Sequence, residues 1–311
     1  MVNDFKIFAG SSNLPLAEKI AAQLEKSVSH CTLRRFSDGE IFFQIDENIR
    51  GMDIFIIQST NSPAENLMEL LIMIDACVRA SARRITAVIP YYGYSRQERK
   101  DQPRVAISAK LVANLITKAG VDRVLLMDLH ASQIQGFFDC PSDHLYSSAV
   151  FNEHIRKLRI VQGVAVSPDV GSVKLVRAFA KSLDFSLAIV DKRRPDINQA
   201  EVMNIIGEVK GKDVVIRDDM VDTAGTLTEA AHALKEHGAK RIVAACTHAV
   251  LSGNAVEKIE KSPIERFFIS DTIKHPLEKL GSKIEILSVS GVFSEAISRI
   301  HEERSLSSLF I

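Results

Sequence analysis

The chain has 311 residues, enough for two domains of ordinary size that each bury a hydrophobic core. Lys plus Arg equals Asp plus Glu at 39 each, which excludes a protein whose overall charge attracts nucleic acid or anionic membranes. The four cysteines form no C-x-x-C pair and no apolar run approaches about 18 residues, so we expect a cytoplasmic protein with no disulfide framework, zinc site or membrane span.

The first segment with chemical character is FSDGE at 36–40. Asp38 and Glu40 flank Gly39 and follow Phe36, a combination that can stack on a nucleotide base and accept hydrogen bonds from its amino group. A plain turn after a strand explains the same composition equally well, so this segment alone does not decide between the two.

One strand–helix–strand unit occurs twice in the sequence. RGMDIFIIQST at 50–60 and ARRITAV at 82–88 flank a predicted helix over 66–80, and KGKDVVIRDDM at 210–220 and AKRIVAA at 239–245 flank another over 227–237. Repeated alternation of this kind predicts two tandem α/β domains, each a mostly parallel sheet flanked by helices. We place the boundary after Tyr146, giving domains 1–146 and 147–311.

Three further segments carry charged or polar side chains where a predicted strand ends. GYSRQERKD at 93–101 offers cations for a polyphosphate, DLHASQIQG at 128–136 presents His130, and VSPD at 166–169 ends in Asp169. His130 and Asp169 could share a Mg²⁺ ion or its waters. The alternatives are a solvated charge run for the first and a structural or capping histidine for the second.

VDKRRP at 190–195 closes the predicted strand FSLAIV with three consecutive cations at a turn. Lys192, Arg193 and Arg194 could form an electrophilic clamp on a transferring phosphoryl group. An isolated basic cluster is more often a set of solvated surface charges with no role in the reaction.

DVVIRDDMVDTAGT at 213–226 is the most informative segment. An apolar strand runs into Asp218 and Asp219, and a small loop then opens a helix that ends before Gly238. Backbone N–H groups over 223–226 can surround a phosphate, while the carboxylates accept from sugar hydroxyls directly or through a divalent cation. The pattern therefore suggests a ribose phosphate; the alternative is that Thr226 and Glu229 form only a capping box and that the aspartates merely end a strand.

Taken together, FSDGE, SRQERKD, MDLHASQIQGFFD, VSPD, DKRRP and DDMVDTAGT occur in an order and spacing that resemble the ribose-phosphate diphosphokinase (PRPP synthetase) family. The resemblance covers nearly the whole chain, to SLSSLF at 305–310. It implies two phosphoribosyltransferase-like domains, transfer of the diphosphoryl group of Mg-ATP to the 1-hydroxyl of ribose 5-phosphate, release of AMP, and a homo-oligomer, usually a hexamer.

The resemblance also implies roles for individual residues. It assigns ATP to the first domain and ribose 5-phosphate to the second, with Mg²⁺ at His130 and Asp169 and with Lys192 and Arg194 on a catalytic loop. The implied ATP contacts are Phe36, Asp38, Glu40, Arg96 and Gln97, and the implied ribose 5-phosphate contacts are Asp218, Asp219, Asp222, Thr223, Ala224, Gly225 and Thr226.

Three positions depart from the family pattern. Arg217 stands where the family usually has an aliphatic residue, Ser172 replaces the usual second glycine of PDVGSVK, and Ser95 replaces an alanine.

Two other functions would keep some of the same motifs. A phosphoribosyltransferase that consumes PRPP needs only one such domain, and a catalytically silent regulatory relative should have lost residues that are intact here, among them Lys192 and His130.

Overall fold

The computed structural model describes residues 4–193 and 202–309. The chain packs as two compact units, which are described one at a time. Unit 1 comprises Met1–Ser147, Thr272–Lys274 and Ser288–Ile311, and unit 2 comprises Ser148–Asp271 and His275–Leu287. Among the described residues, none of the helices is long and apolar enough to cross a lipid bilayer.

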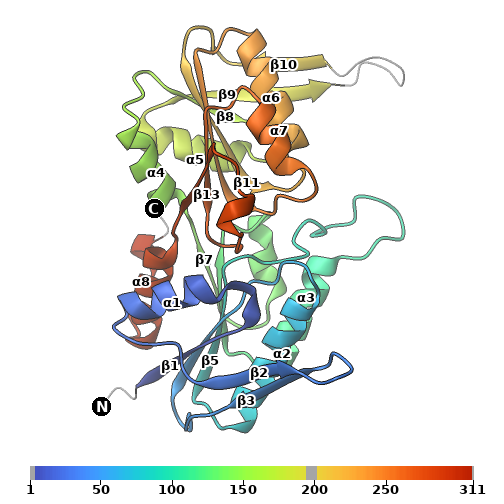
Figure 1. Cartoon of the computed structure of the whole chain (residues 1–311), viewed down its shortest axis with the longest axis vertical. Coiled ribbons are helices and arrows are strands. Elements are labelled where there is room, and N and C mark those ends of the chain that lie inside the picture. Colours follow the sequence, from blue (N-terminus) through green and yellow to red (C-terminus); the bar gives the residue numbers. More distant parts are fainter. Residues whose placement is uncertain (1–3, 194–201, 310–311) are drawn as a thin grey trace. The chain divides into compact units, whose positions relative to one another are not determined.

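Unit 1 contains a parallel sheet and a separate β-hairpin (Figure 1). The sheet strands lie side by side in the order β1-β4-β5-β6-β7, and the hairpin pairs β2 with β3 in antiparallel register. The elements are β1 (Phe5–Ala9), η1 (Ser11–Asn13), α1 (Leu14–Gln23), β2 (Cys31–Arg35), β3 (Ile41–Ile45), β4 (Asp53–Ile57), α2 (Glu65–Arg79), β5 (Arg84–Ile89), α3 (Ser108–Ala119), β6 (Arg123–Met127), η2 (Ser132–Phe137), β7 (Ser142–Leu145), α8 (Ser290–His301) and η4 (Ser307–Leu309).

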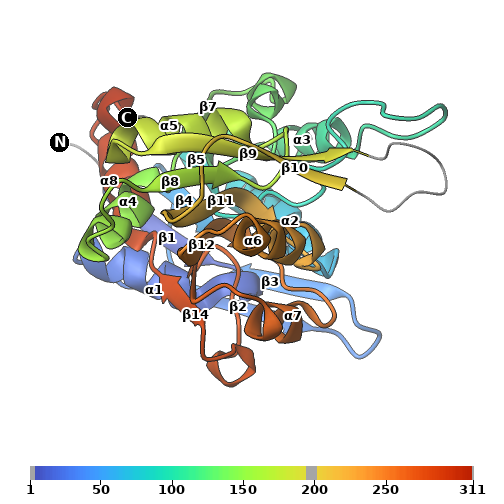
Figure 2. The same cartoon turned by 90° about the horizontal axis from the view of Figure 1, so that it is seen from above.

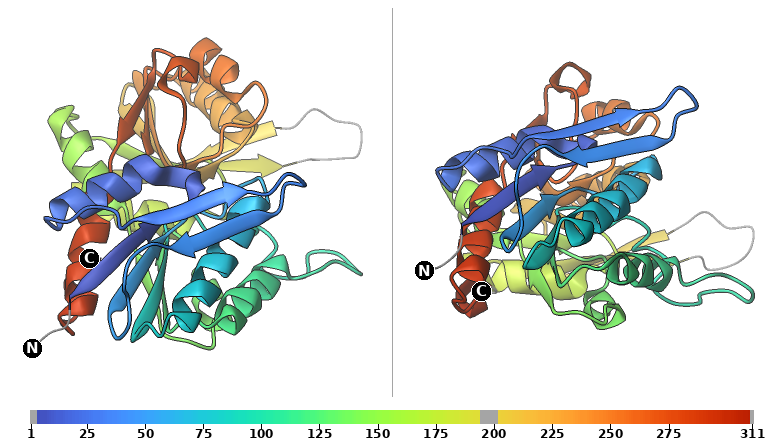
Figure 3. Two further views of the ribbon diagram at one scale, coloured as in Figure 1. Left: turned by 60° about the horizontal axis from the view of Figure 1, so that its bottom comes forward. Right: turned by 90° about the horizontal axis from the view of Figure 1, so that it is seen from below.

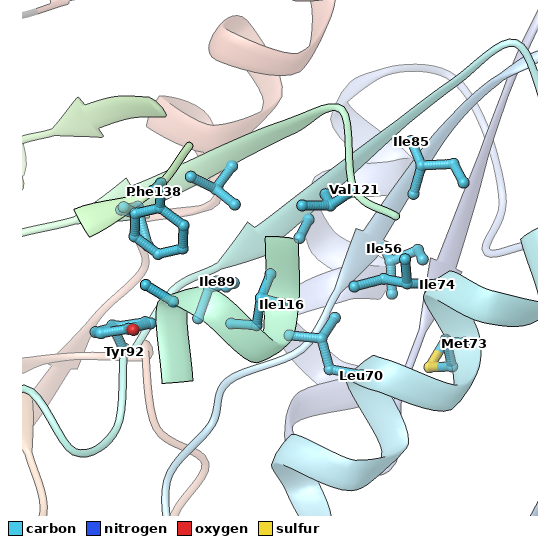
Figure 4. Close-up of a cluster of buried hydrophobic side chains, with 14 of the residues drawn as sticks. Ile56, Leu70, Met73, Ile74, Ile85, Ile89, Tyr92, Ile116, Val121 and Phe138 are labelled. Atoms are coloured by element: carbon cyan, nitrogen blue, oxygen red, sulfur yellow. The ribbon is translucent and has the colours of Figure 1, made fainter. Parts of the chain in front are cut away.

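Helices cover both faces of this sheet, as Figure 3 shows. Because successive side chains of a strand point to opposite faces, Phe8 and Ile56 lie in one core with α2 and α3, while the Phe5 ring contacts His301 of α8 at 4.7 Å between centroids. The core beneath α2 and α3 is drawn in Figure 4, where Tyr92 and Phe138 meet edge to face with centroids 5.7 Å apart. Both faces are buried, which explains the near-continuous apolar strands of the sequence.

The last helix of the chain belongs to unit 1. Gln23 Nε2 of α1 donates to Ser290 Oγ at 3.0 Å, Ser294 Oγ donates to Gln23 Oε1 at 2.8 Å, and Arg84 Nη2 donates to the carbonyl of Ile300 at 2.9 Å. The division expected from the sequence, 1–146 and 147–311, counts these residues with the second domain. A linear repeat pattern carries no signal for a terminal helix that returns to the first sheet.

Asp53 anchors this returning helix to the sheet. Its buried carboxylate accepts from Arg83 Nε at 3.0 Å and Arg84 Nη2 at 2.6 Å, and its Oδ2 lies 2.9 Å from His301 Nδ1. We expect Asp53→Asn to lower the free energy of unfolding by about 2 kcal/mol in urea denaturation, less than a fully buried pair would lose because both arginines are partly exposed.

The exposed pair Asp75–Arg79 on α2 provides the control for this substitution. The two residues are four apart on one helix and both are solvent-exposed, so Asp75→Asn should cost no more than about 0.5 kcal/mol. Equal losses for the Asp53 and Asp75 variants would show that Asp53 does not anchor α8.

Unit 2 contains a larger sheet with strand order β10-β9-β8-β11-β12-β13-β14, parallel except for the β10–β9 pair. Figure 2 shows α4 and α5 on one face of this sheet and α6 and α7 on the other. The elements are α4 (Ser148–Lys157), β8 (Val164–Ser167), α5 (Val173–Leu183), β9 (Ser186–Arg193), β10 (Val202–Ile206), β11 (Asp213–Val221), α6 (Gly225–Glu236), β12 (Arg241–Ala249), α7 (Ala255–Lys261), β13 (Arg266–Ser270), η3 (Leu277–Lys279) and β14 (Ile284–Leu287).

The predicted fold class, α/β with mostly parallel sheets flanked by helices, is confirmed. The predicted helix over 227–237 is also confirmed, since α6 ends at Glu236 and Gly238 follows with φ +83°. Two strand ends were predicted too early. β11 continues beyond the aspartate pair to Val221 because it pairs with β12 as far as Ala249, and β9 continues to Arg193 because it pairs with β10.

Candidate functional site

The FSDGE segment forms the tight turn between β2 and β3. The Phe36 N–H donates to the carbonyl of Glu40 at 2.9 Å, and the Asp38 carboxylate accepts from the N–H of Glu40 at 3.0 Å. Gly39 has φ +96°, a backbone conformation that residues other than glycine rarely adopt. Phe36 is 45% exposed, and Asp38 and Glu40 are also exposed, so the turn presents an aromatic ring beside two carboxylates.

Two arginines support this turn and were not predicted from the sequence. Arg34 places its guanidinium carbon 5.1 Å from the centroid of the Phe36 ring and 4.2 Å from that of Phe42. Arg35 donates to the carbonyl of Gly39 at 3.2 Å and lies 3.6 Å from the buried carboxylate of Glu69. The spacing of Arg34 and Phe36, two residues apart where β2 ends, was the available sequence signal for the first contact.

Arg96 and Gln97 are exposed in a turn that follows β5. The carbonyl of Gln97 accepts from the N–H of Ala109 at 3.2 Å, and its Oε1 accepts from the Ser108 hydroxyl, so the turn is tied to the start of α3. Gly93 opens the turn, and a Cβ at this position would lie 2.1 Å from the carbonyl oxygen of Thr60. Only glycine fits there, which fixes where the chain leaves the sheet.

His130 is exposed at the carboxyl end of β6. Hydrogen bonds fix the two residues before it. Asp128 is buried and accepts from the backbone N–H of Ser147 at 3.2 Å. The N–H of Leu129 donates to Nε2 of the buried His144 at 2.9 Å. His144 was not predicted. It fixes the backbone next to His130 only in a form whose Nε2 carries no proton, because that nitrogen accepts a hydrogen bond.

In unit 2, Asp169 and Asp218 are joined through Ser172. The Ser172 N–H donates to Asp169 Oδ1 at 3.0 Å, and the Ser172 hydroxyl donates to Asp218 Oδ1 at 2.6 Å. Asp169 follows β8 and Asp218 lies in the neighbouring strand β11, so strand order brings the two carboxylates to the same edge of the sheet. The Asp218 Oδ1 atom also accepts from the N–H of Asp219 at 2.9 Å.

Burial raises the pKa of Asp218 well above its ordinary value, and the charges of Asp219 and Asp169 raise it further, while the hydrogen bond from Ser172 opposes them. Crowded carboxylates of this kind favour hydroxyl donors or a hard cation as ligands. Across 4–193 and 202–309, no three His, Cys, Asp or Glu side chains form a ready metal cage. The oxygen ligands fit Mg²⁺, which usually keeps several waters and binds through one or two carboxylates plus substrate phosphates.

The segment 222–226 connects β11 to α6. α6 begins at Gly225, and Ala224, with φ 59°, occupies the N-cap position. The capping box considered for Thr226 and Glu229 is therefore wrong, because Thr226 is already inside the first helical turn. A helix that starts without a side-chain cap directs its first N–H groups outward, where an anion can accept from them.

The backbone of this loop is fixed from α7 and the β12–α7 connection. Ser252 N–H donates to the carbonyl of Asp222 at 2.9 Å, and Lys258 Nζ donates to the carbonyl of Thr223 at 3.1 Å. The lysine adds a positive charge beside the loop. It was not predicted, since a partly exposed lysine 35 residues away in sequence carries no local signal of the contact.

The basic segment is only partly described. Lys192 lies in β9 opposite Met203 of β10, so its backbone is strand rather than the turn expected from VDKRRP. Arg194 lies outside the described residues.

The predicted residues thus fall into separate groups. Phe36, Asp38 and Glu40 share one turn, and Arg96 and Gln97 share another in the same unit. In unit 2, Asp169, Asp218 and Asp219 come together, and the loop 222–226 follows directly along β11. His130 belongs to unit 1 and Asp169 to unit 2. Their sharing of one ion stays a prediction.

Comparison with known proteins agrees with these features. Residues 5–120 match the family described as the N-terminal domain of ribose phosphate pyrophosphokinase, and residues 188–311 match the phosphoribosyl synthetase-associated domain. The ribose-phosphate pyrophosphokinase of Chlorobaculum tepidum is 58% identical over 311 residues, covering 100% of this chain and 96% of the relative. That of Campylobacter jejuni is 54% identical over 308 residues, covering 99% of each.

A solved structure is similar over the same length. The crystal structure of phosphoribosylpyrophosphate synthetase from Mycobacterium smegmatis superposes with a TM-score of 0.91 at 38% sequence identity, covering 97% of this chain and all of that one. Full-length identity above half, the two matched domains and the superposition agree on one assignment: the chain belongs to the ribose-phosphate pyrophosphokinase family of enzymes.

Proposed function

We propose that the protein transfers the β,γ-diphosphoryl group of Mg-ATP to the 1-hydroxyl of ribose 5-phosphate, giving PRPP and AMP. The observation that supports this most is the arrangement along β11. The buried Asp218, linked to Asp169 through Ser172, is followed within a few residues by a loop and an uncapped helix start suited to a phosphate. Family membership supports diphosphoryl transfer as the reaction at such a site.

On the sugar side, the loop Asp222–Thr226 would bind the 5-phosphate. Its backbone N–H groups and the positive end of the α6 dipole favour a dianion, and Lys258 adds charge beside it. Asp218 and Asp219 would accept from the ribose hydroxyls, because carboxylates are acceptors and would repel the phosphate itself. This division of roles leaves the 1-hydroxyl as the reacting group.

On the nucleotide side, Phe36 would stack on the adenine ring, and Asp38 or Glu40 would accept from its amino group. The exposed Phe36 ring at the hairpin turn supports this assignment, since base stacking on an aromatic ring is worth about 1–3 kcal/mol. Arg96 and Gln97, exposed in their own turn, are assigned to the phosphates of ATP.

The reaction would be an in-line displacement at the β-phosphorus with AMP leaving. Asp218 and the phosphate loop would hold the sugar so that its 1-hydroxyl faces the β-phosphate, which makes positioning the main contribution of the protein. Lys192 and Arg194 would stabilise charge on the transferring group. His130 and Asp169 are the residues assigned to hold Mg²⁺, which when bound would supply positive charge to offset that of the phosphates.

One assay tests the function directly. The purified protein is incubated with ribose 5-phosphate and Mg-ATP, and AMP and PRPP are followed by chromatography, with ribose 5-phosphate omitted as the control. We expect AMP and PRPP in equal amounts only when both substrates are present. No AMP would overturn the proposal: consumption of added PRPP in the presence of a nucleobase would then indicate a phosphoribosyltransferase, and complete inactivity would indicate a silent relative.

We expect the activity to require a divalent cation, because ATP and a sugar phosphate bring many negative charges beside Asp169 and Asp218. Excess chelator should reduce product formation to background, and added Mg²⁺ should restore it. Calorimetry should show in parallel that ATP binding weakens without the cation. Full turnover in excess chelator would contradict the assignment of His130 and Asp169 to a metal site.

Two further expectations accompany the proposal. The protein assembles as a homo-oligomer, with a hexamer as the expected size, and it works in the cytoplasm.

A further inference from the structure

Asp218 is held at two different atoms by two neighbouring side chains. Ser172 Oγ donates to its carboxylate oxygen Oδ1 at 2.6 Å, and Arg217 Nη1 donates to its backbone carbonyl oxygen. A residue that is fixed at both its side chain and its main chain leaves its carboxylate little freedom to rotate. The two donors are also two of the positions at which the sequence departs from the family pattern.

Arg217 is fully buried, with 0% of its surface exposed. Its Nη2 donates to Thr247 Oγ1 at 2.7 Å, its Nη1 also lies 3.5 Å from the carbonyl of Ala245, and its guanidinium carbon is 4.5 Å from the centroid of the Phe151 ring. Removing a cation from water costs several kcal/mol, which only good hydrogen bonds and electrostatic contacts offset. These contacts bind the ends of β11 and β12 together at the residue that carries the carboxylate.

The alternation of side chains along β11 determines how Arg217 can act. Val215 packs in the core cluster of α4 and α5, and Arg217, two residues on, points to the same face toward Phe151. Asp218 points to the opposite face. Arg217 therefore acts on Asp218 through its backbone carbonyl and not through its carboxylate.

Ser172 acts from the other side. It stands at the N-cap of α5 and is buried, and its backbone N–H is already directed to Asp169 Oδ1 at 3.0 Å. Its hydroxyl is the group that reaches Asp218. A glycine or alanine here keeps the N–H contact to Asp169 and loses only the contact to Asp218.

We propose that Ser172 and Arg217 are positioning residues that together fix Asp218 in the orientation in which it accepts from the ribose hydroxyls. The inference rests on the proposed function, in which Asp218 binds ribose 5-phosphate. It predicts that loss of either donor weakens ribose 5-phosphate binding and leaves the nucleotide side unaffected.

The test measures KM for each substrate and kcat in four variants. Ser172→Ala and Arg217→Met should each raise KM for ribose 5-phosphate about tenfold, the usual effect of losing one hydrogen bond to a charged or buried group, with KM for ATP and kcat changed less than about twofold. Ser172→Thr keeps the hydroxyl and should retain the original KM. Val215→Ala, on the face of Arg217 but without a bond to Asp218, should lower Tm and leave both KM values unchanged.

The double variant tests whether the two residues act on one group. Because both donors fix the same residue, KM for ribose 5-phosphate in Ser172→Ala/Arg217→Met should rise less than the product of the two single effects. A fully multiplicative effect would show that the residues act independently and would overturn a shared role. If Arg217→Met does not fold, the Ser172→Ala and Ser172→Thr pair decides, since neither removes a buried charge.

Asp218→Ala separates failure of this inference from failure of the proposed function. If Asp218→Ala raises KM for ribose 5-phosphate but Ser172→Ala does not, the positioning role is overturned and the sugar site stands. If Asp218→Ala also leaves that KM unchanged, the sugar site itself is misassigned.

Discussion

Replacing Lys192 and Arg194 together by alanine should lower kcat by on the order of 10²-fold or more, equivalent to about 3 kcal/mol of transition-state stabilisation. The two cations are assigned to the transferring diphosphoryl group, whose charge is stabilised mainly in the transition state. KM for each substrate should therefore change much less than kcat. Steady-state kinetics of the purified double variant, with Tm measured alongside, tests both statements.

Arg193→Ala is the matched control within the same segment. Alternate residues of an extended chain face opposite sides, so the expectation from the sequence is that Arg193 faces away from the group that Lys192 and Arg194 bind. Its loss should have a milder effect. If the double variant releases AMP at a near-normal rate while remaining folded, the three cations are surface charges, which usually contribute little.

Asp218→Ala should raise KM for ribose 5-phosphate by on the order of 10²-fold, because it removes a buried hydrogen-bond acceptor from the sugar site. KM for ATP should change far less. Asp218→Asn keeps the size of the side chain. It should also raise KM for ribose 5-phosphate more than KM for ATP, since the amide replaces one acceptor oxygen with a donor. Initial rates with each substrate varied at saturating levels of the other measure both constants.

Phe36→Ala provides the converse experiment on the nucleotide side. Loss of the exposed ring should raise KM for ATP about tenfold through lost stacking, and Phe36→Tyr, which keeps a ring, should restore it. KM for ribose 5-phosphate should remain near its original value. Equal effects of Asp218→Ala and Phe36→Ala on both substrates would contradict the assignment of the sugar to unit 2 and the nucleotide to unit 1.

The sequence by itself determined those features that depend on neighbours a few residues away. Apolar runs such as Val124–Met127 marked the strands, helical periodicity marked α2 and α6, and the left-handed glycine after Glu236 marked a helix end. Strand ends that carry Asp169 and the segment 218–226 were also visible locally. The alternation of these elements was sufficient to predict α/β units with parallel sheets, because only that arrangement buries both faces of such strands.

Tertiary structure decided the features that depend on partners far away in the chain. β11 includes Asp218 and Asp219 because β12 continues to pair with it, and α8 joins the first sheet because Gln23, Arg84 and Asp53 bind it there. Local propensity says nothing of either, since the hydrogen bonds that decide them join distant segments.

The surroundings of Asp218 show the same distinction most clearly. The sequence contains Ser172 and Arg217 only as two departures from a motif. The fold brings Ser172, 46 residues away, within 2.6 Å of the Asp218 carboxylate, and it buries Arg217 against Phe151 and Thr247. Which residue types occur is a property of the chain; which of them share a hydrogen bond is decided by strand order and side-chain direction, and these exist only once the sheet has formed.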